Sequence, residues 1–450
     1  MAERSTYPPA TESPFDLGRI DPTIVLAEGP ASLRRGREAI ALEHVQIFVS
    51  ARPSWAIRFD GTGHSTDSRD MDRALGQWEA DKILMQGEQG GGSVYGSTTQ
   101  LGGDFGTLPF AIKASGQLQE MEVGGAKKFR QLIFHVANLP DFHGSAIANG
   151  SRTWTGRLQL RNGDWEVIID ARAEISELMS ELSTQGGFAV THVGSLSKSG
   201  QSFTRDESNE VLTGLHWFLS FVRGAWSSPI LLSGQSIHGA ATWRSFRIGR
   251  TDAWGGSHRW CDWTNWGAAQ EAYAGYARLC ADPVWEQGLR VAIGQYVTAN
   301  KPNPLETAIL VAQSGLELLG WLQFVESHQV LERDWRNRRK YPAERKIRNL
   351  LQLGNIDLSI PPQLASLQNL VRSWRDGPAV VAGVRNRLAH PRSASGKVGW
   401  PGQVLVDTWL LISRYLELAL LHAMDVRSGI RDRLGSSQWT GVTANPPWVP

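Results

Sequence analysis

Apolar and polar residues alternate in several short runs of the N-terminal half of the chain. In the clearest run, Val45, Ile47 and Val49 alternate with polar positions, which is the period of a half-buried β-strand. The run from Leu132 to Ala137 is apolar almost throughout and predicts a buried strand. Glycine-rich turns separate the runs, so we expect a sandwich or an open barrel. The predicted strands lie near residues 45–49, 55–59, 110–113, 132–137, 165–170 and 188–193.

The apolar spacing changes to a helical period after Thr204. Thr204 and Glu207 have the spacing of a capping box, and the apolar stripe that follows ends at Gly224. Residues 225–285 are rich in tryptophan and show no clear period. Helical spacing returns at Asn303, an N-cap residue followed by proline. Further helices are expected at residues 342–354, 362–374, 378–389 and 402–425, enough for an all-α bundle.

These patterns predict an α+β protein, in which a β-rich, sandwich-like N-terminal region is followed by an all-α C-terminal helical bundle. The length of 450 residues fits two or three domains. We expect a flexible tail at residues 1–20, a β-rich domain at 21–200, a helix with a Trp-rich connecting region at 201–298, the helical bundle at 299–428 and a C-terminal tail at 429–450.

The composition is that of a globular protein, with 41% hydrophobic and 20% charged residues. The net charge is only +2, so a surface that binds anions must be local. The two cysteines are too few for a disulfide framework and fit a reducing compartment. The N-terminus has no apolar leader, and no run of uncharged apolar residues is long enough for a membrane span. We therefore expect a cytoplasmic protein without a membrane contact.

Two other clusters have structural explanations. His258, Cys261 and Asp262 lie close together, but no second ligand pair follows at zinc spacing, so we expect neither a metal nor a cofactor. Eight of the 19 tryptophans lie between Trp217 and Trp285. Tryptophans grouped in this way could form a sugar-binding platform, but core packing is the favoured interpretation. The central group is Trp254, Trp260, Trp263 and Trp266.

The strongest candidate chemistry lies between Asp376 and Pro391. Asp376 can cap a helix, and Pro378 suits its first turn. Pro391 disfavours helical geometry at His390, so we expect this histidine at the helix C-terminus, where the helix dipole favours a positively charged imidazole.

Two further polar residues lie close to this histidine along the predicted helix. Asn386 precedes His390 by four residues and shares its face, whereas Arg385 precedes it by five and lies off that face. The segment Val384–Pro391, late in a helical bundle, resembles the motif of the HEPN superfamily: an arginine, a polar residue, three others and a histidine. The resemblance covers residues 300–427. A β-rich region before such a bundle also resembles the arrangement of ApeA-like antiviral proteins.

The resemblance implies metal-independent cleavage of RNA, in which the ribose 2′-OH attacks the adjacent phosphate and leaves a cyclic phosphate. His390 would be the general acid or base, Arg385 would stabilise the charge on the phosphate, and Asn386 would orient His390 or the phosphate. It also implies a homodimer, because HEPN sites form where two copies of the motif meet. Glu317 could support the site, although an exposed acidic position is the simpler interpretation.

A basic segment precedes the motif, and its charge density suits phosphate contacts. Trp335 and Tyr341 within it could stack on bases, and the alternative is a solvated loop with a basic helix start. The residues expected to bind RNA are Arg336, Arg338, Arg339, Lys340, Arg345, Lys346, Arg387 and Arg392.

These observations lead to two hypotheses. The first is an HEPN-like endoribonuclease, an antiviral defence effector whose N-terminal domain senses a protein trigger. The alternative is a non-catalytic dimeric scaffold that binds RNA or a nucleotide, or recognises a partner. In that case the arginines near His390 belong to a solvated helix end, and the histidine caps the last carbonyls.

Overall fold

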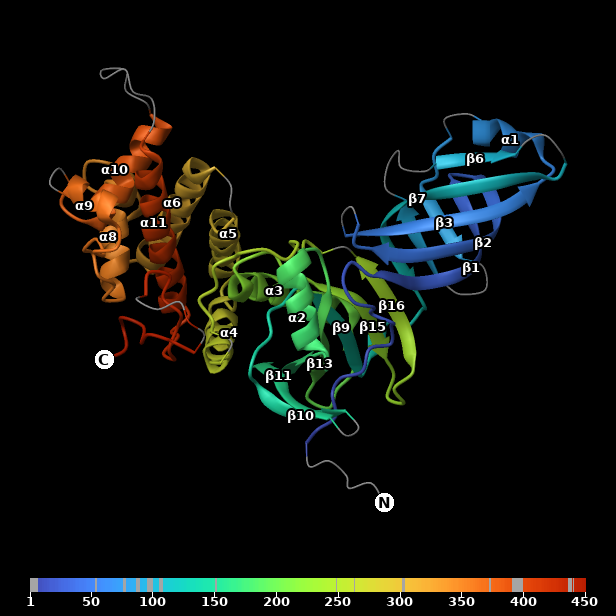
Figure 1. Cartoon of the computed structure of the whole chain (residues 1–450), viewed down its shortest axis with the longest axis horizontal. Coiled ribbons are helices and arrows are strands. Elements are labelled where there is room, and N and C mark those ends of the chain that lie inside the picture. The colour runs from blue at the N-terminus through green and yellow to red at the C-terminus, as the bar shows by residue number, and fades with distance from the viewer. Residues whose placement is uncertain are drawn as a thin grey trace.

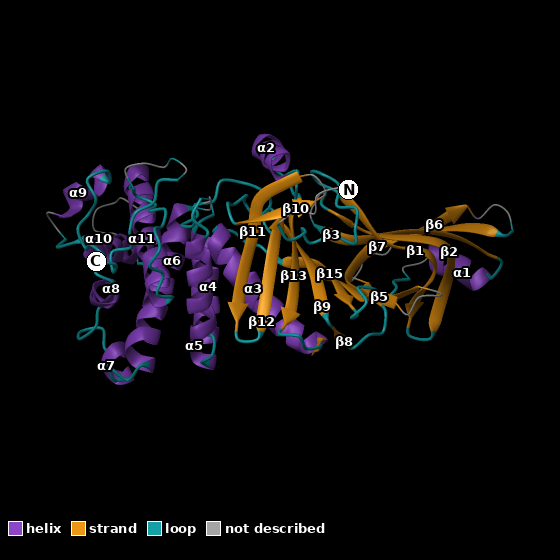
Figure 2. Cartoon of the chain, turned by 90° about the horizontal axis from the view of Figure 1, so that it is seen from below, coloured by secondary structure: helices purple, strands orange, loops and turns teal. Residues whose placement is uncertain are grey.

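The structure is a computed structural model that describes residues 7–52, 55–75, 78–85, 90–94, 100–104, 108–149, 152–247, 249–262, 264–301, 304–371, 374–390, 400–435, 439 and 441–450. The molecule is elongated and has three parts: strands at one end, a sheet with helices on it in the middle, and a helical bundle at the other end (Figure 1). Most of the helices lie away from the strand-rich end (Figure 2). The predicted α+β organisation, with a β-rich N-terminal region, is confirmed.

The strands of the N-terminal end form a closed ring. Its order is β7-β3-β2-β1-β4-β5, and β5 pairs again with β7. Leu118 of β7 pairs with Ile57 of β3 and with Val94 of β5, so these two neighbours lie on opposite edges of β7. The strands are β1 (Thr23–Arg35), β2 (Glu38–Ser50), β3 (Ala56–Ser65), β4 (Lys82–Met85), β5 (Gly90–Val94), β6 (Gln100–Asp104) and β7 (Phe110–Val123).

The core of the ring follows from the alternating pattern in its strands. Val45, Ile47 and Val49 are all buried, whereas the residues between them are less so. Phe59 of β3 and Ile112 of β7 join them in one apolar cluster. The alternation predicted from the sequence therefore places these side chains correctly.

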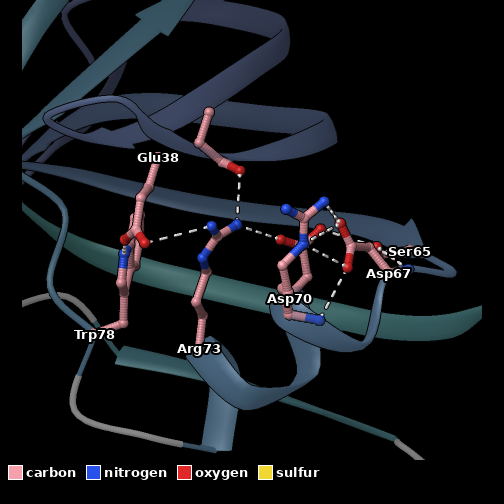
Figure 3. Close-up of polar contacts among 8 residues, drawn as sticks. Glu38, Ser65, Asp67, Asp70, Arg73 and Trp78 are labelled. Carbon is pink, nitrogen blue, oxygen red and sulfur yellow. Dashed lines mark hydrogen bonds and ion pairs between the residues drawn. The ribbon is translucent and has the colours of Figure 1, made fainter.

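A polar network attaches the short helix α1 (Ser68–Leu75) to the ring (Figure 3). Ser65 Oγ donates to Asp70 Oδ2 at 2.9 Å, and Arg73 Nη1 donates to Asp70 Oδ1 at 2.8 Å. Trp78 Nε1 donates to Glu38 Oε2 at 2.8 Å, and this hydrogen bond lowers the pKa of Glu38. Arg73 Nη2 also lies 3.6 Å from Glu38 Oε1. The network thus ties α1 to the end of β3 and the start of β2.

The middle sheet continues from the ring through β7. Its far end pairs with β16, and the order then runs β16-β15-β9-β13-β12-β11-β10. All these strands belong to one continuous 14-stranded sheet, which differs from the two packed sheets of a sandwich. The strands of this part of the sheet are β9 (Gln131–Ala137), β10 (Ser145–Asn149), β11 (Arg152–Asn162), β12 (Trp165–Ala171), β13 (Val190–Lys198), β15 (Pro229–Gln235) and β16 (Ala241–Arg247). Two short strands, β8 (Lys128–Phe129) and β14 (Phe203–Thr204), pair with each other as a separate two-stranded sheet.

Two parts of this sheet bear on the sequence predictions. Strands β15 and β16 lie within residues 201–298, the segment expected to be a connecting region. Strand β9 is buried on both faces: Leu132 and Phe134 face the core shared with the helices, and Ile133 and Ala137 face the core of the ring. This explains why its sequence is apolar almost throughout, as expected of a buried strand.

Helix α3 (Arg205–Arg223) crosses the middle of the molecule and has the predicted capping box. Glu207 N donates to Thr204 Oγ1 at 3.2 Å, and Thr204 N donates to the Glu207 carboxylate at 2.8 Å. The helix ends at Gly224, whose φ of 70° suits glycine. Leu215 and Phe218 are fully buried in the core that the helix shares with the sheet and the bundle. The start, the stop and the apolar stripe of this helix were all predictable.

The C-terminal third is helical, as predicted. Asn303 lies outside the described residues, and the helix expected there begins at Leu305. By length and composition alone, one helix among the described residues, Leu305–Glu326, could span a membrane, and 61% of its most apolar window is buried inside the protein. Besides α1 and α3, the chain has α2 (Ile175–Gln185), α4 (Gly267–Leu279) and α5 (Pro283–Ala299) before this third. The helices of the C-terminal third are α6 (Leu305–Trp321), the π-helical turn η2 (Leu322–Glu326), α7 (Glu332–Arg336), α8 (Ala343–Leu353), α9 (Ala365–Val371), α10 (Gly377–Ala389) and α11 (Gly402–Ala423).

The tryptophans of the central group belong largely to the core. Trp260 is fully buried and Trp266 is 4% exposed, while Trp254 is partly buried and packs against the small cluster under α2. Trp263 lies outside the described residues. Core packing therefore accounts for the tryptophans of this group that the structure describes.

Candidate nucleic-acid interface

Helix α10 carries the predicted motif, and its start is fixed by an ion pair. Asp376 accepts a hydrogen bond from Ala379 N at 3.0 Å, as expected of an N-cap. The Arg348 guanidinium of α8 donates two hydrogen bonds to this carboxylate, at 2.8 and 3.0 Å. Partial burial raises the pKa of Asp376, but the hydrogen bonds and charge of Arg348 outweigh it, so that the pKa lies below its usual value. The N-terminus of α10 is therefore held in place by Arg348.

One face of α10 packs into the bundle. Val380, Val381 and Val384 are fully buried and belong to the large core that the helices share. Because the buried side is occupied by these valines, Asn386, Arg387 and His390 of the last turn are exposed, whereas Arg385 is partly buried. The motif thus lies on the surface rather than inside the protein.

The helix ends at His390, as the following proline predicts. His390 has φ −136° and ψ 74°, outside helical geometry, while its N–H still donates to Asn386 O at 2.9 Å. The side chains of Asn386 and His390 are exposed. Among the residues that the structure describes, no hydrogen bond or ion pair holds the His390 imidazole, so it is free to meet a ligand.

Arg385 and His390 are not in contact within one chain. Arg385 is partly buried, and its Nη1 donates to Asn386 Oδ1 at 3.2 Å. At about 100° per residue, Arg385 lies about 140° around the helix from His390, whereas Arg387 lies only about 60° from it. The structure therefore joins Arg385 to Asn386 and leaves Arg387 as the arginine on the histidine side of the helix.

Arg387 packs against two tryptophans that were not among the residues expected from the sequence. Its guanidinium carbon is 5.2 Å from the ring centre of Trp374 and 4.8 Å from that of Trp400. The two rings are 5.9 Å apart and inclined at 60°. A Cβ on Gly383 would come within 2.7 Å of Trp374, so the glycine makes room for this ring. Trp374 and Trp400 each lie 13 residues from Arg387 and 26 residues from each other, so only the tertiary fold could reveal the cluster.

Glu317 lies on α6 and accepts a hydrogen bond from Gln313 Nε2 at 2.9 Å. The side chain is partly buried. Within the described part of the chain, no hydrogen bond or ion pair connects Glu317 to Arg385, Asn386 or His390. The structure offers no contact through which it would support the motif.

The basic segment is partly neutralised by its own acidic residues. Arg336 pairs with Glu332 at 2.6 Å, and Lys340 pairs with Asp334 at 2.7 Å. The turn between them is held by the side chain of Asn337, which accepts from two main-chain N–H groups at 3.0 and 3.4 Å. The next two arginines are exposed, and within the described residues neither has an ion pair. They are Arg338 and Arg339.

The two aromatic residues of the basic segment differ in exposure. Trp335 is only 2% exposed and stacks on Phe324 with ring centres 5.6 Å apart, so it is a core residue and cannot stack on a base. Tyr341 is partly buried, with the Arg345 guanidinium 4.8 Å from its ring centre. Lys346 lies over the Trp335 ring at 5.2 Å. These cations are therefore held against aromatic rings.

The expected RNA-binding residues that the structure describes come from two parts of the bundle, the last turn of α10 and the segment from α7 to α8. Among the described residues, no hydrogen bond, ion pair or cation–ring contact joins the last turn of α10 to residues 336–346. Helix α8, which carries Arg345 and Lys346, packs on α10, and its Arg348 holds the start of α10. Arg392 lies outside the described residues.

Comparison with known proteins gives a family likeness. A family model described as the YopA central domain matches residues 124–257, and one described as the YopA C-terminal domain matches residues 282–444. The chain is similar to YopA in two of its segments. The SPbeta prophage-derived uncharacterized protein YopA of Bacillus subtilis (strain 168) is 26% identical over 344 residues, which are 75% of this chain and 76% of that protein. No solved structure matches the chain.

The YopA matches fit the structural parts described above. The first covers the middle sheet with α2 and α3, and the second covers α6, the motif of α10 and α11. The ring of strands from β1 to β7 precedes both matched segments. The candidate interface therefore lies in the segment similar to the YopA C-terminal domain.

Proposed function

We propose that the C-terminal bundle binds and cleaves RNA by an HEPN-like, metal-independent reaction. The observation that carries the proposal is the last turn of α10. It holds an exposed imidazole, an exposed amide and two arginines at the end of a helix whose other face is locked into the core. General acid–base chemistry needs a histidine that can exchange a proton with the substrate, and anionic phosphate needs cations beside it.

In the proposed reaction, the ribose 2′-OH attacks the adjacent phosphorus atom, and the bond to the 5′-oxygen of the next nucleotide breaks. His390 of one copy takes the proton from the 2′-OH or supplies one to the leaving oxygen. Guanidinium groups stabilise the charge on the non-bridging oxygens. The products are a 2′,3′-cyclic phosphate and a free 5′-hydroxyl.

A homodimer completes this proposal. One chain supplies a single His390, and its Arg385 is hydrogen-bonded to Asn386. The reaction needs one group that removes a proton and another that supplies one. Two copies whose α10 ends face each other would provide two imidazoles and four or more guanidinium groups. The N-terminal ring, outside both YopA-like segments, is proposed to recognise a protein trigger.

The test is cleavage of labelled RNA by the purified full-length chain in EDTA. We expect His390→Ala to lower the rate by about 10²- to 10⁴-fold and Arg385→Ala by about 10²-fold or more. His238→Ala is the matched control because His238 is exposed, in the turn after β15, and remote from the motif. Cleavage that survives both substitutions, or that stops in EDTA alone, would remove the proposed site.

One observation favours a second function. Arg385 is hydrogen-bonded to Asn386 and lies far around the helix from His390, an arrangement suited to a bundle that binds RNA without cutting it. In that case the wild-type chain shifts labelled RNA in a binding assay and leaves it intact, with or without candidate triggers. The two outcomes are read in the same reaction mixture.

A further inference from the structure

We infer that Trp374, Arg387 and Trp400 form a subsite that binds an unpaired nucleobase, so that the ligand of this surface is single-stranded RNA. The inference rests on the proposed RNA-binding function and adds the class of substrate. Its basis is the geometry of the cluster, which presents a planar cation, fixed from behind, at the end of α10.

The cluster holds the guanidinium in place before any ligand arrives. Arg387 is exposed, yet both tryptophan rings contact its guanidinium, and Gly383 lets Trp374 approach the helix closely. A free arginine side chain loses rotamer entropy when it orders against a ligand. Here that loss has already occurred in the unliganded chain, so stacking a ligand on this guanidinium is favoured over stacking on a mobile one.

The other exposed arginines of the bundle lack this arrangement. Arg338 and Arg339 extend from a turn, and Arg336 is 5.6 Å from the single ring of Trp321 and already paired with Glu332. Within the described chain, Arg387 alone among the expected RNA-binding residues contacts two rings and has no acidic partner. Such a cation attracts phosphate through its charge, and its flat face also accepts a stacked base.

The position of the cluster relates it to the proposed chemistry. Arg387 precedes His390 by three residues, a spacing that brings Cβ atoms to about 5–6 Å on a helix. A base on the guanidinium would therefore lie next to the sugar and phosphate that meet His390. Bases in a duplex already stack on their neighbours and present only their edges, so only an unpaired base can occupy this subsite.

The experiment measures RNA binding by the full-length His390→Ala chain in EDTA, so that cleavage does not interfere. The probes are a fluorescein-labelled single-stranded oligonucleotide of about ten nucleotides, its abasic counterpart and a duplex of equal length. Arg387→Lys keeps the charge and removes the planar group. Arg250→Lys is the matched control, because it changes an exposed arginine that lies 4.4 Å from the ring centre of Trp226 and is not among the expected RNA-binding residues. Trp374→Leu removes half of the support, and a thermal melt checks that each variant folds.

We expect Arg387→Lys to weaken binding of the single strand by about 5- to 100-fold. Binding of the abasic strand and the duplex is expected to stay within about twofold, because the charge is kept. Trp374→Leu should follow Arg387→Lys, and Arg250→Lys should resemble the parent. Equal loss for the intact and abasic strands, no loss, or no binding by the parent chain would overturn the inference. If RNA cleavage requires His390 but is unchanged in Arg387→Lys, the base-binding subsite is refuted and the proposed nuclease activity is not. If binding requires Arg387 but the wild-type chain cleaves no RNA, the nuclease activity is refuted and the subsite is not.

Discussion

Glu417 of α11 is a buried charge that holds several segments together. Tyr296 of α5 donates to its carboxylate at 2.6 Å, and Arg433 of the C-terminal segment donates at 3.2 Å. His258 Nε2 lies 3.4 Å from the other oxygen. The carboxylate thus connects α5, α11, the end of the chain and the Trp-rich region. We predict that Glu417→Gln, which keeps the shape and removes the charge, destabilises the protein strongly.

Two routes give the same magnitude for this loss. Breaking a buried ion pair by removing one partner costs about 3–5 kcal/mol, and the side chains of Glu417 and Arg433 are each 2% exposed. Burial alone would raise the pKa of Glu417, but His258 and Arg433 lower it to about 2. A shift of that size from the usual value corresponds to about 3 kcal/mol of stability. Because the pKa is lowered in the folded state, this contribution is complete above about pH 5 and is lost as the pH falls towards 2.

The assay is urea denaturation at neutral pH, followed by circular dichroism. With a slope of about 3 kcal/mol per molar urea, Glu417→Gln should lower the midpoint by roughly 1 M. Glu317→Gln is the control, because that partly buried residue is bonded only to Gln313 among the described residues, and its effect should stay below about 0.5 kcal/mol. If the two glutamine variants are equally stable, the network does not hold the segments together.

Three further predictions concern the middle of the molecule. Burial lowers the pKa of His135 to about 4. The free energy of unfolding should therefore fall by up to about 3 kcal/mol as the pH drops from about 6.5 to 4. Urea midpoints measured across that range should depend less steeply on pH in His135→Gln. Thr204→Ala removes the hydroxyl that caps α3 and should cost about 1 kcal/mol in calorimetry, whereas Thr204→Ser should be nearly neutral. Gly194→Ala places a Cβ within 2.3 Å of the Phe134 ring and should cost about 1–3 kcal/mol; an unchanged melting temperature would show that the ring moves aside freely.

Helices and strands were predicted well because the signals for their starts, ends and buried faces lie in residues close together in the sequence. The capping box at Thr204, the proline at 378 and the stop at His390 each depend on neighbours within a few positions, and all three appear in the structure. The alternation of β2 likewise places its side chains correctly. Such features need no knowledge of the tertiary fold.

The pairing of strands depends on distant partners and was not predictable. Strand β5 is mostly glycine and has no side-chain pattern, yet it closes the ring by pairing with β7. Strand β15 has no alternation because the five residues at its centre are all buried, and its register shifts at Leu231, which has a φ of 52°. Where a sandwich or an open barrel was expected, one continuous sheet is found whose N-terminal strands close into a ring, and strands extend beyond residue 200.

The candidate site likewise has features that local sequence predicts and features that depend on distant residues. The exposed turn with Asn386 and His390 followed from helical spacing, whereas the two rings around Arg387 come from outside its helix. Trp335 looked available for stacking because its neighbours in sequence are basic, but its ring packs under η2. Sequence proximity indicated the charge of this surface and could not indicate which aromatic rings it exposes.

Strand β7 gives the molecule a mechanical property. Its 14 residues extend about 46 Å and are shared by the N-terminal ring and, through β16, by the sheet under the helices. Modules joined by a linker can rotate independently, but here main-chain hydrogen bonds run without a break from one body into the other. A displacement produced at the far end of the ring is therefore conveyed along a stiff strand to the sheet on which the helices rest.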